Sequence, residues 1–264
     1  MPYRGRFAPS PTGPLHMGSL VTALASYIDA RANKGEWLVR IEDIDPPREK
    51  PGAAEHILSD LVIHGFKWDG EVIFQSNRLK AYESALSYLV KANAAFKCTC
   101  PRRRLNSDGS CASRCFSRQH YMNEKFAFRF DYDPQVNIKI NDFILGEKIW
   151  NNQDLPKDFV IKRRDGLFSY QLAVLVDDVF QRITHVIRGS DLLDSTPKQL
   201  EIGSALNYPQ LKYGHIPTIT DIQGKKLSKQ TFAPSINRNQ AIQNLRQALL
   251  LLGQKQPNNM LKTP

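Results

Sequence analysis

Residues 6–20 read Arg6-Phe-Ala-Pro-Ser-Pro-Thr-Gly-Pro-Leu-His-Met-Gly-Ser-Leu20, a short apolar segment followed by a proline-rich turn. We expect a buried strand over Arg4–Ala8 and a helix that begins near Gly18, because apolar residues then recur at helical spacing in Leu20, Leu24, Tyr27 and Ile28. The first turn of a helix presents unpaired N–H groups and a positive dipole end, so this turn suits a phosphate. His16 could donate to that phosphate, although a histidine in a glycine-containing loop more often has a structural or solvated role.

The next segments alternate strands and helices. Trp37–Ile41 predicts a second strand, which ends at the acidic pair Glu42 and Asp43. Two amphipathic helices are predicted after it, from Ile57, Leu58, Leu61 and Val62 and then from Leu79, Tyr82, Leu86 and Leu89. This order is typical of a parallel α/β sheet.

The same pattern returns further along the chain. Leu172–Val176 and Thr184–Arg188 are apolar runs that predict more strands of the parallel sheet, and Ala241–Leu252 predicts a helix. We therefore expect an α/β core formed by residues 1–95 and 165–216. A lysine-rich loop and a helical stem are expected over residues 217–264.

Residues 96–164 differ from this core and are predicted to be an inserted α+β module. Phe126–Phe130 and Val136–Ile140 alternate apolar and other residues, as antiparallel strands do. Phe159–Lys162 is expected to close the module before a turn at Asp165-Gly166.

All four cysteines of the chain lie in this module, at Cys98, Cys100, Cys111 and Cys115. Such clustering in a chain without other cysteines predicts a structural Zn²⁺ site with four thiolate ligands rather than disulfides. The alternative is four reduced thiols. Five neighbouring arginines are either contacts for nucleic-acid phosphates or solvated side chains: Arg102, Arg103, Arg104, Arg114 and Arg118.

The chain carries 36 Lys plus Arg against 26 Asp plus Glu, a formal charge of +10. This excess favours nucleic acid or nucleotide phosphates as partners, though basic proteins without such partners are common. The N-terminus lacks the pattern of a signal peptide, and no apolar run reaches the ~20 residues of a membrane helix. We expect a cytoplasmic monomer without membrane contact.

A second signal follows Gly224, where the sequence reads Lys225-Lys-Leu-Ser-Lys-Gln230. Alone, this run would be read as a solvated loop, but a lysine loop can also close over a polyphosphate and offset its charge. Together with His16-Met-Gly-Ser19, it resembles the HIGH and KMSKS signatures of the class I aminoacyl-tRNA synthetases. Ser19 replaces the last histidine of HIGH, and Leu and Gln replace two residues of KMSKS, departures that the glutamate branch of the class accepts.

This resemblance implies a Rossmann-like catalytic core that binds ATP with Mg²⁺. Its ATP-binding residues would be His16, Gly18, Ser19, Lys226 and Lys229. His16 and Lys229 would be catalytic, stabilising the transition state by electrostatics while a carboxylate attacks the α-phosphorus.

Arg6-Phe-Ala-Pro-Ser-Pro-Thr-Gly13 and Arg40-Ile-Glu-Asp-Ile-Asp45 resemble glutamyl-tRNA synthetase. The resemblance implies an L-glutamate pocket formed by Arg6, Phe7, Ala8, Pro9, Ser10, Glu42, Tyr170 and Arg188. The chemistry agrees, because glutamate has two carboxylates and one ammonium group, which require guanidinium partners and a carboxylate partner. Without the motifs, the same residues would be read as ordinary ion pairs at a sheet edge.

Too few residues follow Gln230 for an anticodon-binding domain of ordinary size, about 100 residues or more. We therefore expect a catalytic core with no anticodon-binding domain. Across nearly its whole length the chain resembles the glutamyl-queuosine tRNA(Asp) synthetase family, including Arg163-Arg-Asp-Gly-Leu-Phe-Ser-Tyr170 and Val176-Asp-Asp178. That family forms glutamyl-adenylate without tRNA, esterifies queuosine at the wobble position in the anticodon arm of tRNA(Asp), and has a zinc site in its insertion.

Three alternatives stay open at this point. A truncated or paralogous glutamyl-tRNA synthetase would charge the 3′ end of a tRNA. A non-catalytic zinc-containing RNA-binding protein with a decayed synthetase core would have lost active-site residues, yet His16, Glu42 and Arg188 are all present. Another nucleotidyltransferase with a HIGH signature would lack a glutamate pocket.

Overall fold

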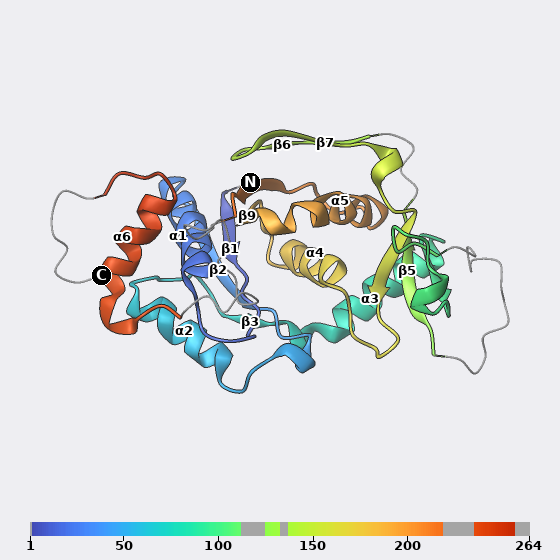
Figure 1. Cartoon of the computed structure of the whole chain (residues 1–264), viewed down its shortest axis with the longest axis horizontal. Coiled ribbons are helices and arrows are strands. Elements are labelled where there is room, and N and C mark those ends of the chain that lie inside the picture. Colours follow the sequence, from blue (N-terminus) through green and yellow to red (C-terminus); the bar gives the residue numbers. More distant parts are fainter. Residues whose placement is uncertain (1, 112–124, 133–136, 219–234, 257–264) are drawn as a thin grey trace.

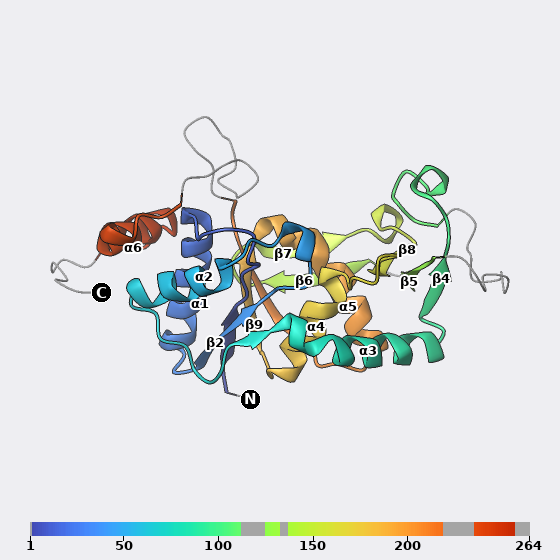
Figure 2. The same ribbon diagram turned by 90° about the horizontal axis from the view of Figure 1, so that it is seen from below.

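The computed structural model describes residues 2–111, 125–132, 137–218 and 235–256 (Figure 1). The molecule is elongated, with α6 (Ala241–Leu251) at one end and the three-stranded sheet of the inserted module at the other (Figures 1 and 2). No helix in these ranges combines the length and apolar character needed to cross a membrane.

A parallel sheet forms the centre of the fold. β1 (Arg4–Phe7), β2 (Glu36–Ile41) and β3 (Ile73–Phe74) pair in parallel in that order, and β9 (His185–Gly189) pairs in parallel with β10 (Lys212–Ile216). The two groups meet along β1 and β9, where the backbone N–H of Thr184 donates to the carbonyl of Arg4 over 2.9 Å. The chain builds the sheet outward from β1 in one direction and from β9 in the other. The crevice between these strands is therefore a switch point, the usual ligand site of such sheets.

Helices alternate with the strands of this sheet, as the sequence pattern predicts, and the first of them packs directly against β1, β2 and β9. The α-helices are α1 (Met17–Ala32), α2 (Ala53–Ile63), α3 (Leu79–Lys91), α4 (Tyr170–Phe180), α5 (Thr196–Ala205) and α6. Short 3₁₀ helices lie between them: η1 (Pro46–Arg48), η2 (Gln75–Arg78), η3 (Arg102–Arg104), η5 (Asn152–Asp154), η6 (Ser190–Ser195) and η8 (Arg238–Gln240). The expected buried faces are wrong at Ile28, Val62 and Leu79, whose side chains are exposed.

The prediction of a strand over Leu172–Val176 was wrong, because these residues form the middle of α4. All five side chains are buried. A short run of buried residues lacks the polar alternation that distinguishes a helix from a strand, so periodicity did not decide between them. Thr184–Arg188, by contrast, matches β9, whereas β10 was not predicted.

Two antiparallel units form the insertion. β4 (Ala95–Cys98), β5 (Ala127–Asp131) and β8 (Asp158–Lys162) pair in that order. β6 (Ile138–Asp142) and β7 (Gly146–Trp150) form a hairpin that reaches back over α5 toward β9 (Figure 1). The strands predicted around Phe126–Phe130, Val136–Ile140 and Phe159–Lys162 are thus confirmed where the structure describes them, and β7 is an addition.

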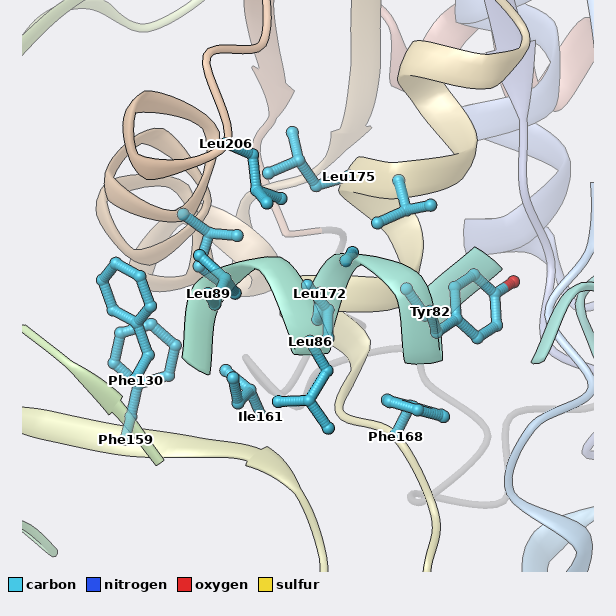
Figure 3. Close-up of a cluster of buried hydrophobic side chains, with 14 of the residues drawn as sticks. Tyr82, Leu86, Leu89, Phe130, Phe159, Ile161, Phe168, Leu172, Leu175 and Leu206 are labelled. Atoms are coloured by element: carbon cyan, nitrogen blue, oxygen red, sulfur yellow. The ribbon is translucent and has the colours of Figure 1, made fainter. Parts of the chain in front are cut away.

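One hydrophobic core joins the insertion to the rest of the chain. Figure 3 shows side chains from α3, the insertion strands, α4 and the segment after α5 in a single cluster. Its labelled members are Tyr82, Leu86, Leu89, Phe130, Phe159, Ile161, Phe168, Leu172, Leu175 and Leu206. The inserted module therefore has no separate core at this contact, and its position relative to α4 is set by close packing.

Candidate active site

A cleft of about 830 Å³ opens at the carboxyl ends of β1, β2 and β9. Eleven of the site residues predicted from the sequence line it: Arg6, Phe7, Ala8, Pro9, Ser10, His16, Gly18, Ser19, Glu42, Tyr170 and Arg188. Lys226, Lys229 and Cys115 lie outside the described residues. Both predicted pockets, for the nucleotide and for the amino acid, thus face one continuous space.

His16 is the N-cap of α1 and is held by its own helix. Its Nδ1 atom accepts a hydrogen bond from the backbone N–H of Ser19 over 3.2 Å, so this nitrogen carries no proton. Nε2 then carries the proton and lies 3.0 Å from the Ser19 hydroxyl oxygen. A histidine fixed in this way presents a neutral N–H donor beside the unpaired N–H groups of the helix, the arrangement expected for a phosphate site.

The residues that follow the segment 219–234 lie beside this turn, and Thr218, which precedes it, lies at the cleft. Ser235 forms an isolated antiparallel bridge with His16, and the N–H of Ile236 donates to the carbonyl of Leu15 over 3.1 Å. Thr218 lines the cleft and lies within hydrogen-bonding distance, 3.0 Å, of the Ser190 hydroxyl.

A buried ionic cluster forms the floor of the cleft. Nε of Arg6 donates to Asp178 over 3.2 Å, and the same carboxylate oxygen accepts from Arg40 over 2.8 Å. Arg40 also lies 3.4 Å from Glu42. All four side chains are at least nine-tenths buried. Although burial opposes ionisation of Asp178, the two guanidinium groups hold its pKa below the usual range.

Behind this cluster lies Asp177. No role was predicted from the sequence for Asp177 or for Asp178. Asp177 accepts hydrogen bonds from Gln75 over 2.8 Å, from Arg78 over 2.6 Å and from Tyr82 over 2.6 Å. Asp177 and Asp178 belong to Val176-Asp-Asp178, which was noted as a family feature without a role. The signal was two adjacent carboxylates at the end of a fully apolar run, because buried carboxylates require cationic partners.

Glu42 has an unusual pKa for a carboxyl group. Burial raises this pKa to about 7, against the opposing effect of Arg40 and Arg6. The group therefore exchanges its proton near neutral pH, and an ammonium ion placed beside it would favour the ionised form. Such a perturbed carboxyl group in a cleft is typical of a functional site.

Arg188 lies across the cleft and has four partners. Its guanidinium donates to the Gln199 side-chain oxygen and the Thr196 hydroxyl, each over 2.8 Å, to Tyr170 over 3.3 Å and to Nε2 of His215 over 3.0 Å. All four acceptors are uncharged groups: an amide oxygen, two hydroxyls and an imidazole nitrogen. Among the described residues, no carboxylate contacts Arg188, so its charge faces the cleft without an anion.

The cysteine cluster lies in the insertion, apart from the residues that line the cleft. The Sγ atoms of Cys98, Cys100 and Cys111 lie within 4.8 Å of one another, and Cys111 is 3.6 Å from each of the other two. Thiolates around a tetrahedral Zn²⁺, with Zn–S bonds of about 2.3 Å, are separated by about 3.8 Å. The three described ligands therefore fit such a metal, and Asp158 fixes Cys111 by accepting from its backbone N–H over 2.9 Å.

Comparison with known proteins agrees with this fold and site. The model of a family described as tRNA synthetases class I (E and Q), catalytic domain, matches residues 3–253. The chain thus belongs to the class I synthetase catalytic domains of the glutamate and glutamine branch.

Closer relatives narrow the family. The chain is 46% identical to the Glutamyl-Q tRNA(Asp) synthetase of Acinetobacter baylyi, covering 98% of this chain and 90% of that protein. It is 47% identical to the protein of the same name from Thiobacillus denitrificans, covering 97% and 87%. Within the class, the chain belongs to the glutamyl-Q tRNA(Asp) synthetase family.

Solved structures support the same fold. The glutamate-tRNA synthetase of Elizabethkingia anophelis superposes with a TM-score of 0.74 at 28% identity, over 87% of this chain but only 53% of that chain. A glutamate tRNA ligase from Elizabethkingia meningosepticum in complex with its amino acid superposes with a TM-score of 0.73 at 28% identity. The match covers 87% of this chain and 52% of that chain. The chain thus spans about half the length of these two synthetases.

Proposed function

We propose that this protein activates glutamate with ATP and transfers it to queuosine at the wobble position of tRNA(Asp). One observation supports it above all others: a single cleft gathers two arginines, a titratable glutamate and a helix-capping histidine at the switch point of the sheet. Close relatives named Glutamyl-Q tRNA(Asp) synthetase support the choice of acceptor.

In the first step, the amino acid binds between Arg6 and Arg188, whose guanidinium groups attract its two carboxylates. Glu42 accepts the ammonium group, and Tyr170 orients the substrate through its hydroxyl. Burial of such charges in a preformed site strengthens each contact and excludes water.

ATP, with its Mg²⁺, occupies the His16 end of the cleft. The α-carboxylate oxygen of glutamate attacks the α-phosphorus, the bond to the bridging oxygen breaks, and pyrophosphate leaves. His16 donates its Nε2–H to a phosphate oxygen in place of the Ser19 hydroxyl, while Gly18 offers a backbone N–H at the helix N-terminus and Ser19 offers its released hydroxyl. Lys226 and Lys229 are proposed to supply positive charge. The described residues that flank their segment are Thr218, which lines the cleft, and Ser235, which pairs with His16.

In the second step, a hydroxyl of the queuosine cyclopentenediol attacks the activated carbonyl carbon. AMP leaves and the hydroxyl proton is released. An ester of glutamate forms, and no side chain of the protein needs to act as a nucleophile.

Zn²⁺ in the insertion would be held by Cys98, Cys100 and Cys111, with Cys115 as the fourth ligand. Bound there, it supplies a cross-link rather than chemistry. It would orient the adjacent exposed arginines, Arg102, Arg103 and Arg104, toward the phosphates of the anticodon arm.

Pyrophosphate exchange tests the first step. Glutamate should drive ATP–pyrophosphate exchange without tRNA, and glutamine should not, because it lacks one carboxylate. Labelled glutamate should then transfer to tRNA(Asp) that contains queuosine and not to the same tRNA without it. Equal labelling of both preparations, or labelling of the 3′ end, would contradict queuosine as the acceptor while leaving adenylation intact.

A further inference from the structure

The tip of the β6–β7 hairpin contacts the strand next to Arg188. Asp142, the last residue of β6, accepts two hydrogen bonds from the backbone N–H of His215, each 3.1 Å long. Its Oδ2 atom also lies 2.5 Å from Nδ1 of His215. Both side chains are fully buried. Because Nε2 of the same ring accepts from Arg188, an unbroken chain of contacts links the inserted module to the amino-acid pocket.

The partners of His215 fix its protonation state. Arg188 can only donate, so Nε2 must be an unprotonated acceptor. Asp142 as a carboxylate can only accept, so Nδ1 must carry the proton. His215 is thus a neutral imidazole in a single tautomer.

The surroundings maintain this state. Burial lowers the pKa of His215, as does Arg188 from β9, against the opposing effect of Asp142 from β6. The ring also stacks on Tyr213 at 6.0 Å, and the Thr196 hydroxyl lies 3.3 Å from Nε2. No further charged group is within contact of the ring among the described residues.

We propose that Asp142 and His215 are positioning residues for glutamate activation, which set the orientation of the Arg188 guanidinium without neutralising its charge. This inference rests on Arg188 binding a glutamate carboxylate, as in the proposed function. A carboxylate in direct contact would compete with the substrate, whereas a neutral imidazole fixes the Nε–H direction and leaves the positive charge available.

The packing of the hairpin supports this role. The backbone N–H of Phe143 donates to the carbonyl of Tyr213 over 3.0 Å, and the Phe143 ring lies directly against Gly214. A Cβ atom at position 214 would lie 2.5 Å from that ring, so glycine permits the close approach. The backbone of β10 therefore holds Asp142 at His215 through two residues: Tyr213 accepts from the N–H of Phe143, and His215 donates to Asp142 itself.

Asp142→Asn is the most specific test, because asparagine keeps the shape of the side chain and replaces one acceptor oxygen with an NH₂ donor. Oδ1 of Asp142 accepts from the backbone N–H groups of Ile144 and Leu145, so the amide oxygen must take that place. The amide NH₂ then faces Nδ1 of His215 and forces the other tautomer, whose Nε2–H opposes the Arg188 Nε–H. We expect the KM for glutamate to rise about 10- to 100-fold, with the KM for ATP within about twofold of wild type.

Two further variants separate positioning from a merely structural role. In His215→Gln, the side-chain oxygen takes the place of Nε2 as the acceptor for Arg188, and it has no tautomer to change. Adding Asp142→Asn to this variant should therefore change its KM for glutamate less than about threefold. In an Arg188→Lys background, which lacks the Nε–H, Asp142→Asn should likewise have little effect. Glu147→Gln is the control, because Glu147 is an exposed carboxylate of the same hairpin that pairs with Lys139.

Pyrophosphate exchange with these purified, folded variants decides the matter. If Asp142→Asn leaves the KM for glutamate unchanged, or if its effect is the same with and without the Arg188 Nε–H, the positioning role is wrong. If the wild-type protein gives no glutamate-dependent exchange, the proposed function itself fails. The two failures are therefore distinguishable.

Discussion

Glu42→Gln should remove the fall in glutamate use that begins near pH 7. In the free protein the pKa of Glu42 is raised to about 7 by burial, against the effect of Arg40 and Arg6. An ammonium group pairs with the carboxylate and not with the carboxylic acid. As the pH falls through about 7, kcat/KM for glutamate should therefore fall about tenfold per pH unit, and above this value it should level off.

The size of the effect follows from burial. Glu42 is only 8% exposed, so a substrate ammonium ion bound beside it would be largely desolvated. Removing one partner of a buried charge pair costs about 3–5 kcal/mol, which corresponds to at least about 100-fold in kcat/KM. Glutamine keeps the volume of the side chain and removes only its charge. We expect this loss for glutamate and little change in the KM for ATP.

Glutamate-dependent ATP–pyrophosphate exchange, measured from about pH 5.5 to 8, tests this reasoning. His215, whose pKa is lowered by burial, remains in the variant, so only the Glu42 contribution disappears. The substrate keeps its charges throughout. A wild-type profile without an acid limb, or a variant that keeps the limb and loses less than about threefold of activity, would refute the assignment of Glu42 to the ammonium group.

Other substitutions test the remaining parts of the site. Arg6→Ala should reduce glutamate adenylation at least about 100-fold in a folded protein, as exchange assays can show, and normal turnover would place the pocket elsewhere. Asp178→Asn should lower the free energy of unfolding in urea by about 3–5 kcal/mol, because it leaves Arg6 and Arg40 buried without their shared anion, whereas Asp165→Asn at the surface should cost less than about 1 kcal/mol. Cys98→Ser should lower the bound zinc measured per chain and weaken adenylation without abolishing it, and complete loss of adenylation would contradict a structural role for the metal.

Sequence motifs located the cleft but not the contacts that build it. His16 and Gly18 could be predicted because a strand, a turn and a helix follow one another locally, and local order is visible in a sequence. The contact of Arg40 with Asp178 joins residues far apart in the chain, and no spacing rule connects them. Asp178 was further obscured because the apolar run before it was assigned to a strand rather than to α4.

The same limit applies to the insertion. Alternating apolar residues predicted its antiparallel strands, and the clustered cysteines predicted a metal site, both from short-range patterns. The docking of Asp142 on His215 depends on how the hairpin folds back over β10, which only the packing of the whole chain determines. Gly214 was the one local sign of that contact, since a glycine within a strand often marks a close approach.

The charges of the cleft explain how it can select a dicarboxylic amino acid. Arg6 and Arg40 carry two positive charges, and Asp178 and ionised Glu42 carry two negative charges, so this buried group is neutral as a unit. Arg188 adds one positive charge that no described carboxylate offsets, because His215 separates it from Asp142. Glutamate carries a net charge of about −1 near neutral pH. Its binding would complete the neutrality of the site, whereas glutamine would leave Arg188 desolvated and unpaired, and the cost of that buried charge is what rejects it.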